Sequence, residues 1–425
     1  MIIKLTPHPP KSATNINVSF FGLCALLVAI TILRYTQLFH DQPHQSALFI
    51  IGIFSASIIL LELCWQKSCF KPSTNIKLTQ NNPSFTRTGI KLIGLIGSIA
   101  FIATLYWLFP EYHGDFYDNF FDMIRLILFP WILLSIPYFY WVDKHSVDPH
   151  DGYWCLGMAI CFKWNSIDIS QLKQHLLGWL VKGFFLPLMF TYMCKDLEFF
   201  INFDFAKMNA EHLLFNSTID FLYFIDVTIA TAGYLLSLRL IDTHIRSSEP
   251  TLLGWTVALI CYQPFYSLVE RNYLAYSPDH SWSDKFAHYP LLYALWGTAI
   301  LSCVFIYVWS TVVFGLRFSN LTNRGIITCG PYRWTKHPAY IAKNLSWWMT
   351  AAPFISDGSW SEALRQCLLL SLVSLCYYLR ARTEERHLLS DPEYVAYFSW
   401  MRLNGIFSGF KKIKRLYENL YIHQE

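Results

Sequence analysis

Polar residues of chemical interest crowd into two short stretches near the C-terminus of this 425-residue chain. In the first, His337 precedes Pro338, and proline suits the first turn of a helix because its missing N–H is no loss there. Tyr340 follows three residues later, so the imidazole and the phenol ring can border one pocket at the helix entrance. Gly330-Pro331 enforces a turn just upstream, which brings the backbone of Ile326-Ile327 close to the same place. The sequence therefore predicts a ligand pocket at this helix entrance.

The second stretch, Arg380-Ala381-Arg382-Thr383-Glu384-Glu385, ends a long apolar run. Arg380 and Glu384 lie four residues apart and therefore share a helical face. Each feature alone has an ordinary structural explanation, since an arginine beside an apolar run is commonly a topology anchor. An Arg/Glu pair at this spacing is commonly a surface salt bridge worth about 0.2–0.5 kcal/mol. The two stretches lie at the two ends of one predicted helical hairpin, and this joint placement favours a functional site.

The composition of the chain indicates which class of protein positions these residues. Apolar residues make up 54% of the chain and charged residues 15%, against usual values of about 45–50% and about 25%. This composition excludes a disordered chain, a coiled coil and a collagen-like fibre, and it argues against a water-soluble enzyme. The net charge of +4 is too small to indicate a nucleic-acid-binding protein. The 11 cysteines are scattered without a C-x-x-C pair, so we expect neither a metal site nor a disulfide framework.

A membrane-spanning helix needs about 20 mainly apolar residues, because its backbone polar groups must be satisfied within the helix. Ten stretches qualify, which predicts an all-α, polytopic transmembrane helical bundle of about ten spans. The last two form a hairpin closed by the turn Ser356-Asp357-Gly358-Ser359. The ten stretches are 18–33, 46–65, 90–109, 120–141, 176–194, 219–241, 251–269, 290–314, 338–355 and 362–379.

Basic residues are distributed unevenly between the two sides of these spans. With ten spans, 24 of the 33 Lys and Arg residues lie on the side that carries both termini, five lie on the opposite side and four lie within spans. Because short cytoplasmic loops retain positive charge, we predict that both termini are cytoplasmic. The first apolar run is interpreted as a retained signal-anchor helix, since Arg34-Tyr35-Thr36 follows it where a small-residue cleavage site would be needed.

Three strings carry a resemblance to a known family. Ile327-Thr328-Cys329-Gly330-Pro331-Tyr332, then Lys336-His337-Pro338-Ala339-Tyr340, then Arg380-Ala381-Arg382-Thr383-Glu384-Glu385 resemble the isoprenylcysteine carboxyl methyltransferase family in order and spacing. The string 391–397 is similar to the family's closing amphipathic helix. Lys336 and Ala342 stand where the family usually has Arg and Gly. The resemblance covers about residues 315–410, which divides the chain into an N-terminal region 1–315 of unknown role, with about eight spans, and a catalytic module 316–425 of two spans and the amphipathic helix.

The resemblance implies an integral membrane enzyme that uses S-adenosylmethionine without a Rossmann domain, and the sequence has no strand-turn-helix glycine fingerprint. It implies a cofactor pocket at the cytoplasmic face, formed by the C-terminal helices. Arg380 would hold the acceptor, which we expect to be the carboxylate of a lipidic or prenylated substrate that arrives from the bilayer. Glu384 would contact the cofactor. The other cofactor contacts implied are Arg324, Gly325, Ile326, Ile327, Tyr332, His337, Pro338, Ala339 and Tyr340.

Alternatives stay open at this point. A methyltransferase acting on a phospholipid amine or a small thiol would need a base, which Glu384 or Glu385 would supply. A sterol-type reductase shares a similar basic-His-Pro-x-Tyr turn but binds NADPH, and the cofactor's 2′-phosphate would need further Arg or Lys around the loop. A transporter or scaffold built on the first eight spans is the third possibility, with a C-terminal module that has lost its activity.

Overall fold

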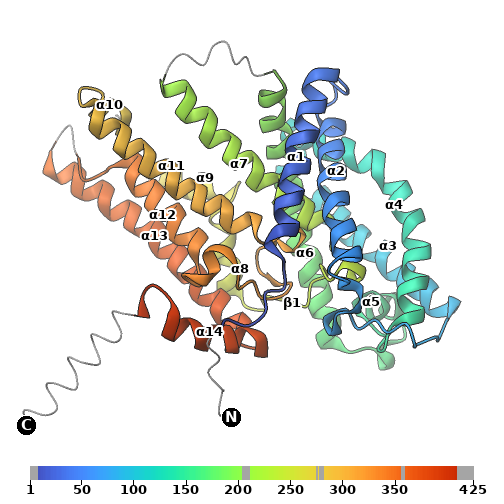
Figure 1. The fold of residues 1–425 in the computed structure, drawn as a ribbon. Helices are drawn as coiled ribbons and strands as arrows, with labels where there is room; N and C mark the ends of the chain where they lie inside the picture. Colours follow the sequence, from blue (N-terminus) through green and yellow to red (C-terminus); the bar gives the residue numbers. More distant parts are fainter. Residues whose placement is uncertain (1–7, 203–210, 274–275, 277–281, 356–358, 409–425) are drawn as a thin grey trace, which may run out of the picture. The chain divides into compact units, whose positions relative to one another are not determined.

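The computed structural model describes residues 8–202, 211–273, 276, 282–355 and 359–408. Nearly all regular structure in these ranges is helical, and its strands are one short antiparallel pair, β1 (Ser247–Ser248) with β2 (Thr322–Asn323). This confirms the predicted all-α class. The helices, shown in Figure 1, are α1 (Ile16–Thr36), α2 (Pro43–Cys64), α3 (Phe85–Leu108), α4 (Asp118–His145), α5 (Gly152–Ile160), α6 (Ile169–Asn202), α7 (Glu211–Leu235), α8 (Leu252–Leu259), α9 (Phe265–Asn272), α10 (Trp282–Phe286), α11 (Pro290–Val312), α12 (Pro338–Ala351), α13 (Trp360–Leu388) and α14 (Pro392–Asn404).

Eight helices in the described ranges are long and apolar enough to cross a membrane. Two of the ten predicted stretches do not form such a helix. The stretch 251–269 is divided, because α8 ends at Leu259 and α9 begins at Phe265, directly after Pro264, which cannot continue a helix without losing a hydrogen bond. The stretch 338–355 contains α12, which stops at Ala351 because Ala352 is left-handed, with φ of 40°. The predicted turn at 356–358 lies outside the described residues, but the Ser359 hydroxyl caps α13 by accepting a hydrogen bond from the Glu362 amide at 3.3 Å.

The chain divides into two compact units. Unit 1 comprises Met1–Ile16, Leu253–Phe314 and Gly325–Glu425, and unit 2 comprises Asn17–Leu252 and Gly315–Arg324. These limits differ from the predicted division at residue 315, because unit 1 also includes the start of the chain and residues 253–314. Unit 1 is therefore considerably larger than the module that the resemblance covers.

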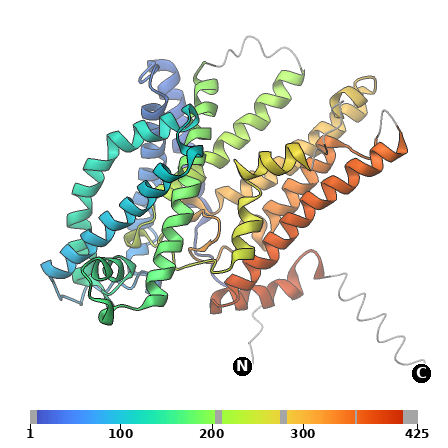
Figure 2. The same cartoon turned by 180° about the vertical axis from the view of Figure 1, so that it is seen from behind.

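In unit 1, helices α11, α12 and α13 run side by side in both views (Figures 1 and 2). The direction of α11 is opposite to that of α12, since the Trp296 indole N–H donates to the Met349 carbonyl at 2.9 Å, whereas the Trp309 and Trp334 rings meet at 5.6 Å near the other end. Helix α13 also runs opposite to α12, and the Trp348 indole N–H donates to the Ser374 hydroxyl at 3.1 Å. The start of α12 and the end of α13 consequently lie at one end of this bundle.

The divided stretch after residue 251 runs along the same bundle. Tyr262 contacts Arg380 near the end of α13, whereas Lys285 of α10 donates to the Ala352 carbonyl at 3.4 Å, just after the end of α12. The segment therefore still leads from one end of unit 1 to the other, although no single helix does so.

In unit 2, α3 packs against α4, α5 and α6, and α6 packs against α2 and α7. The contact between α3 and α5 is made by two glycines. A Cβ added to Gly94 would lie 1.9 Å from the Tyr153 carbonyl oxygen, and one added to Gly157 would lie 2.0 Å from that of Ile90. Because any side chain would collide with backbone, glycine is required for this close approach.

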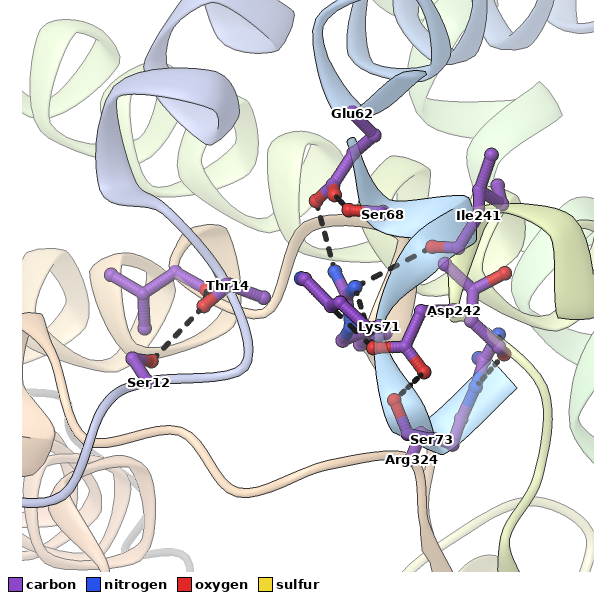
Figure 3. Close-up of polar contacts among 12 residues, drawn as sticks. Ser12, Thr14, Glu62, Ser68, Lys71, Ser73, Ile241, Asp242 and Arg324 are labelled. Atoms are coloured by element: carbon purple, nitrogen blue, oxygen red, sulfur yellow. Dashed lines mark hydrogen bonds and ion pairs between the residues drawn. The ribbon is translucent and has the colours of Figure 1, made fainter. Parts of the chain in front are cut away.

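A buried charge network joins three segments of unit 2, and Figure 3 shows it with Glu62, Ser68, Lys71, Ser73 and Asp242 labelled. The Arg317 guanidinium bridges Glu62 of α2, at 3.0 Å, and Asp242, at 3.3 Å. The Ser73 hydroxyl donates to Asp242 at 2.8 Å, and the Ser68 hydroxyl donates to Glu62. Both carboxylates are almost fully buried, so their charge is balanced within the protein rather than by water.

Candidate active site

The residues singled out in the C-terminal quarter converge at one end of unit 1. Helix α12 begins at Pro338, as predicted, with His337 as its N-cap residue and Ala339 in its first turn. The His337 and Tyr340 rings stack, with their centroids 5.6 Å apart and their planes inclined by 4°. Two rings that the spacing predicts on one face of the helix entrance do lie together there.

Two consecutive carboxylates of α13 meet these rings. The Tyr340 hydroxyl donates to Glu384 Oε2 at 2.8 Å, and His337 Nε2 lies 3.0 Å from Glu385 Oε1. In the described residues, Glu384 Oε1 has no hydrogen-bond partner, and the side chain is half-buried. Glu384 therefore keeps one carboxylate oxygen for a ligand, because a carboxylate can accept at both oxygens.

Glu385, which the sequence indicates only as a possible base, holds the loop before α12 in this site. Its buried carboxylate binds Lys336 and His337 of the loop before α12, and the Arg382 guanidinium on its own helix at 3.1 Å. The Lys336 ammonium also lies 4.1 Å from the centre of the Phe398 ring of α14. Glu385 thus anchors the loop to α13, and Lys336 makes this contact where the resembling family usually has arginine. The adjacent Lys-His and Glu-Glu pairs were the available signal in the sequence.

Arg380 lies one helical turn before Glu384 with its guanidinium among tyrosine rings. The guanidinium carbon is 5.1 Å from the centre of the Tyr340 ring, 5.4 Å from that of Tyr262 and 5.9 Å from that of Tyr377. One of its N–H groups donates to the Tyr262 hydroxyl at 3.4 Å, and the residue is only 6% exposed. Ring faces stabilise a buried cation without neutralising it, and a guanidinium is suited to binding a carboxylate through two parallel hydrogen bonds.

Tyr262 and Tyr377 were not predicted from the sequence. Tyr377 lies three residues before Arg380 on the same helical face, so its position could have been found from spacing. Tyr262 lies in the irregular segment between α8 and α9, outside the region of resemblance. Pro264 inside an otherwise apolar stretch was the sign that this segment leaves the helix.

The loop proposed for cofactor binding reaches the same end of unit 1. Gly325 has a φ of 108°, a conformation that other residues rarely adopt. Ile326 is buried in a cluster with Tyr394, Tyr397 and Met401 of α14. The Tyr397 hydroxyl donates to the Tyr332 carbonyl at 2.7 Å, which fixes the turn at 330–333. Helix α14 therefore supports the loop from one side.

Two buried donor groups in that cluster have no hydrogen-bond partner in the part of the chain that the structure describes. They are the Tyr394 hydroxyl and the Trp400 indole N–H. Burial raises the pKa of Tyr394 well above its usual value, and the nearby carboxylates of Glu385 and Glu384 raise it further, so the hydroxyl remains a donor. Each unpartnered buried donor costs about 1–3 kcal/mol.

The side chain of Arg324 has a structural role, whereas the cofactor contact that the resemblance implies for this residue is through its backbone. Its buried side chain lies in unit 2, where the guanidinium donates to the carbonyls of Gly233 at 2.8 Å, Phe318 at 2.9 Å and Thr243 at 2.6 Å. A further N–H group donates to Leu236, just after the end of α7. This accounts for the early end of α7 at Leu235, where the sequence predicts a span to 241, because the guanidinium satisfies carbonyls that the helix no longer bonds.

We expect Arg324→Lys to lower the stability of the protein by about 2–4 kcal/mol, because an ammonium cannot reach the four carbonyls that the planar guanidinium serves. Thermal unfolding in detergent, followed by intrinsic fluorescence, would measure this. Arg365→Lys is the matched control, since Arg365 is exposed and pairs only with Glu362 in the described contacts. Equal unfolding temperatures for the two variants would contradict this role for Arg324.

The fold and the site define a polytopic helical membrane protein in which a cation, two carboxylates and several aromatic rings meet at one end of a helical bundle. The model of the isoprenylcysteine carboxyl methyltransferase family matches residues 290–390, about a quarter of the chain. The match and the eight apolar helices support one class, an integral membrane methyltransferase. No curated protein and no solved structure matches the chain.

Proposed function

We propose that this protein transfers a methyl group from S-adenosylmethionine to a carboxylate on a lipidic or prenylated acceptor, at the cytoplasmic face of the membrane. The observation that carries the proposal is the Arg380 guanidinium, buried among three tyrosine rings and one helical turn from Glu384. It lies within the region that matches the methyltransferase family.

The residues present fit the cofactor. The half-free carboxylate of Glu384 is suited to an amino group, and the unpartnered donors of Tyr394 and Trp400 are suited to acceptor atoms of an adenosine. The backbone of Gly325, Ile326 and Ile327, together with His337 and Tyr340, would enclose it. When bound, S-adenosylmethionine supplies a methyl group on a positively charged sulfur, a leaving group that needs no further activation.

The residues of this chain then have three tasks. Arg380 would hold the acceptor carboxylate, which is ionised at neutral pH and needs no general base. The rings of Tyr262, Tyr340 and Tyr377 would exclude water that otherwise hydrates the carboxylate. The Glu385 contacts with Lys336 and His337 would keep the loop in place. Positioning and desolvation of this kind are sufficient for an in-line displacement.

The uneven distribution of Lys and Arg supports the cytoplasmic placement of both termini and of the site. In this arrangement a charged cofactor enters from water, and the acceptor enters from the bilayer.

We expect the purified protein to bind S-adenosylhomocysteine in calorimetry and not to bind NADPH. Glu384→Gln should weaken binding at least about tenfold, because it removes a charge-assisted hydrogen bond to the ligand. Glu362→Gln is the matched control, since Glu362 is an exposed glutamate at the far end of the same helix, paired with Arg365.

Binding of NADPH alone would favour the sterol-type reductase instead. Binding of S-adenosylhomocysteine that is indifferent to Glu384→Gln would contradict the site proposed here. Binding of neither ligand would contradict the proposed function and favour a transporter or scaffold.

A further inference from the structure

The beginning of the chain lies against the candidate cofactor loop, more than 300 residues away in sequence. The Ala13 amide donates to the Ile326 carbonyl at 2.9 Å. The Thr328 hydroxyl donates to the Pro10 carbonyl at 2.6 Å, and the Thr328 amide donates to the Ser12 hydroxyl at 3.2 Å. We call residues Pro10–Thr14 the strap. All of these residues belong to unit 1.

Further contacts fix the middle of the strap and its C-terminal end. The Ser12 hydroxyl donates to Cys329 Sγ at 3.4 Å, just beyond Thr328. The buried Thr14 hydroxyl donates to the Val313 carbonyl at 2.7 Å, directly after α11. Figure 3 shows Ser12 and Thr14 with their side chains close together. The strap therefore joins the end of α11 to the loop 326–329.

The loop 324–329 needs contacts from other segments because it has no regular secondary structure. Residues 324–329 form neither helix nor strand, so their backbone groups must find partners elsewhere. Helix α14 packs against the Ile326 side chain, whereas the strap binds the backbone of Ile326 and Thr328. A ligand held by backbone groups requires them within about 0.5 Å of one geometry. Contacts from the strap reduce the number of conformations available to this backbone.

We propose that the strap is part of the cofactor site, and that Ser12 and Thr328 are positioning residues that hold the backbone of Gly325–Thr328 ready for S-adenosylmethionine. This inference rests on the proposed function. It assigns a role in the site to Ser12 and the rest of the strap, which lie outside the family match and almost 300 residues before its start, whereas Thr328 lies within the match.

The test compares Thr328→Val, Ser12→Ala and their double variant with the intact protein. We expect the double variant to bind S-adenosylhomocysteine about tenfold more weakly and to have a KM for S-adenosylmethionine raised by the same factor. Its kcat and its KM for the acceptor should stay within about twofold. Ser346→Ala is the matched control, because this buried hydroxyl bonds only the Lys343 carbonyl within α12 in the described contacts.

A disulfide lock provides a second measurement. Ser12 Oγ lies 3.4 Å from Cys329 Sγ, so Ser12→Cys needs a movement of about 1.4 Å to form a disulfide with Cys329. We expect the reduced S12C variant to bind S-adenosylhomocysteine weakly and the oxidised variant to regain affinity. S12C combined with Cys329→Ser should remain weak under both conditions, which separates this disulfide from oxidation of other cysteines.

Two measurements together distinguish failure of this inference from failure of the proposed function. They are S-adenosylhomocysteine binding and the rate of hydrogen exchange in residues 326–329. If the intact protein binds S-adenosylhomocysteine and the double variant binds it equally well, the strap has no part in the site. If the intact protein does not bind S-adenosylhomocysteine, the proposed function is wrong, and the strap cannot be part of a cofactor site. The strap retains a structural role in that case only if the double variant speeds exchange in 326–329.

Discussion

Arg380→Ala is expected to reduce methyl transfer to a prenylated carboxylate by about 10²–10⁴ in kcat/KM. The reason is that the substitution removes the buried guanidinium that holds the acceptor in the proposed function, and truncating one partner of a buried charge pair costs about 2–5 kcal/mol. Binding of S-adenosylhomocysteine should remain within about threefold of its original value, because Glu384 and the loop 325–327 are unchanged. Arg380→Lys should recover only part of the loss, since an ammonium keeps the charge but not the fork of donors.

Transfer from radiolabelled S-adenosylmethionine to N-acetyl-S-farnesylcysteine would measure the effect of Arg380→Ala. A methyl ester releases its label as methanol in alkali, whereas a methylated amine or thiol does not, so the same assay identifies the acceptor group. Arg365→Ala on the same helix is the control. Full turnover in Arg380→Ala, or an equal loss of S-adenosylhomocysteine binding, would contradict the assigned role. Label that resists alkali would favour the amine or thiol acceptor.

Arg317→Met is expected to destabilise the protein by about 3–5 kcal/mol, the largest effect on stability that we predict. Arg317 bridges the carboxylates of Glu62 and Asp242, which are 3% and 1% exposed. Removing it leaves two buried charges without their shared partner, and this costs more than the intact ion pair contributes. The thermal unfolding midpoint in detergent would measure the loss.

The effect should depend on pH in a defined direction. Burial alone would raise the pKa of Asp242, but the guanidinium groups of Arg317 and Arg246 and the Ser73 hydroxyl lower it below its ordinary value. The stability that this carboxylate contributes is therefore present above that ordinary value and is lost as the pH falls through the lowered pKa. In Arg317→Met the Arg317 charge no longer lowers the pKa of Asp242, so burial raises this pKa relative to the intact protein. The difference in stability between the variant and the intact protein should therefore narrow on acidification toward pH 4.

Combining Arg317→Met with Glu62→Gln and Asp242→Asn keeps this prediction testable. Neutral side chains no longer need the guanidinium, so the triple variant should recover part of the lost stability. Two results together would show that packing rather than charge accounts for the effect. The triple variant would be as unstable as Arg317→Met, and the stability difference between Arg317→Met and the intact protein would not depend on pH. Arg365→Met should leave the midpoint unchanged.

Much of the fold could be predicted because its signals are local. Eight of the ten predicted apolar runs form helices long and apolar enough to cross a membrane, and Pro338 correctly marks the start of α12. The prediction of one spanning helix at 251–269 was wrong. It followed from the high average hydropathy of the stretch and gave too little importance to Pro264, which interrupts the helix. The end of α7 could not be predicted, because it depends on the Arg324 guanidinium from a segment almost 90 residues later.

The same distinction holds for the candidate site. Helical spacing places Arg380 and Glu384 on one face and puts His337 beside Tyr340, and both follow from the sequence alone. Helical spacing could not indicate that His337 bonds Glu385 while Tyr340 bonds Glu384. Glu384 and Glu385 are consecutive on α13, so spacing alone does not decide which of them each ring meets. Nor could it find Tyr262 or the strap, because their partners are contacts between distant segments.

The sequence by itself determined that this chain is an all-α membrane protein, and it identified the C-terminal strings in which methyltransferase chemistry is proposed. Residue type and periodicity are sufficient for this, since burial in a membrane and helical spacing act over about 20 residues. Only the tertiary structure decided which carboxylate anchors the loop, which tyrosines surround Arg380 and that residues 10–14 bind residues 326–329. These depend on the path of the backbone, which brings together groups that no local pattern relates.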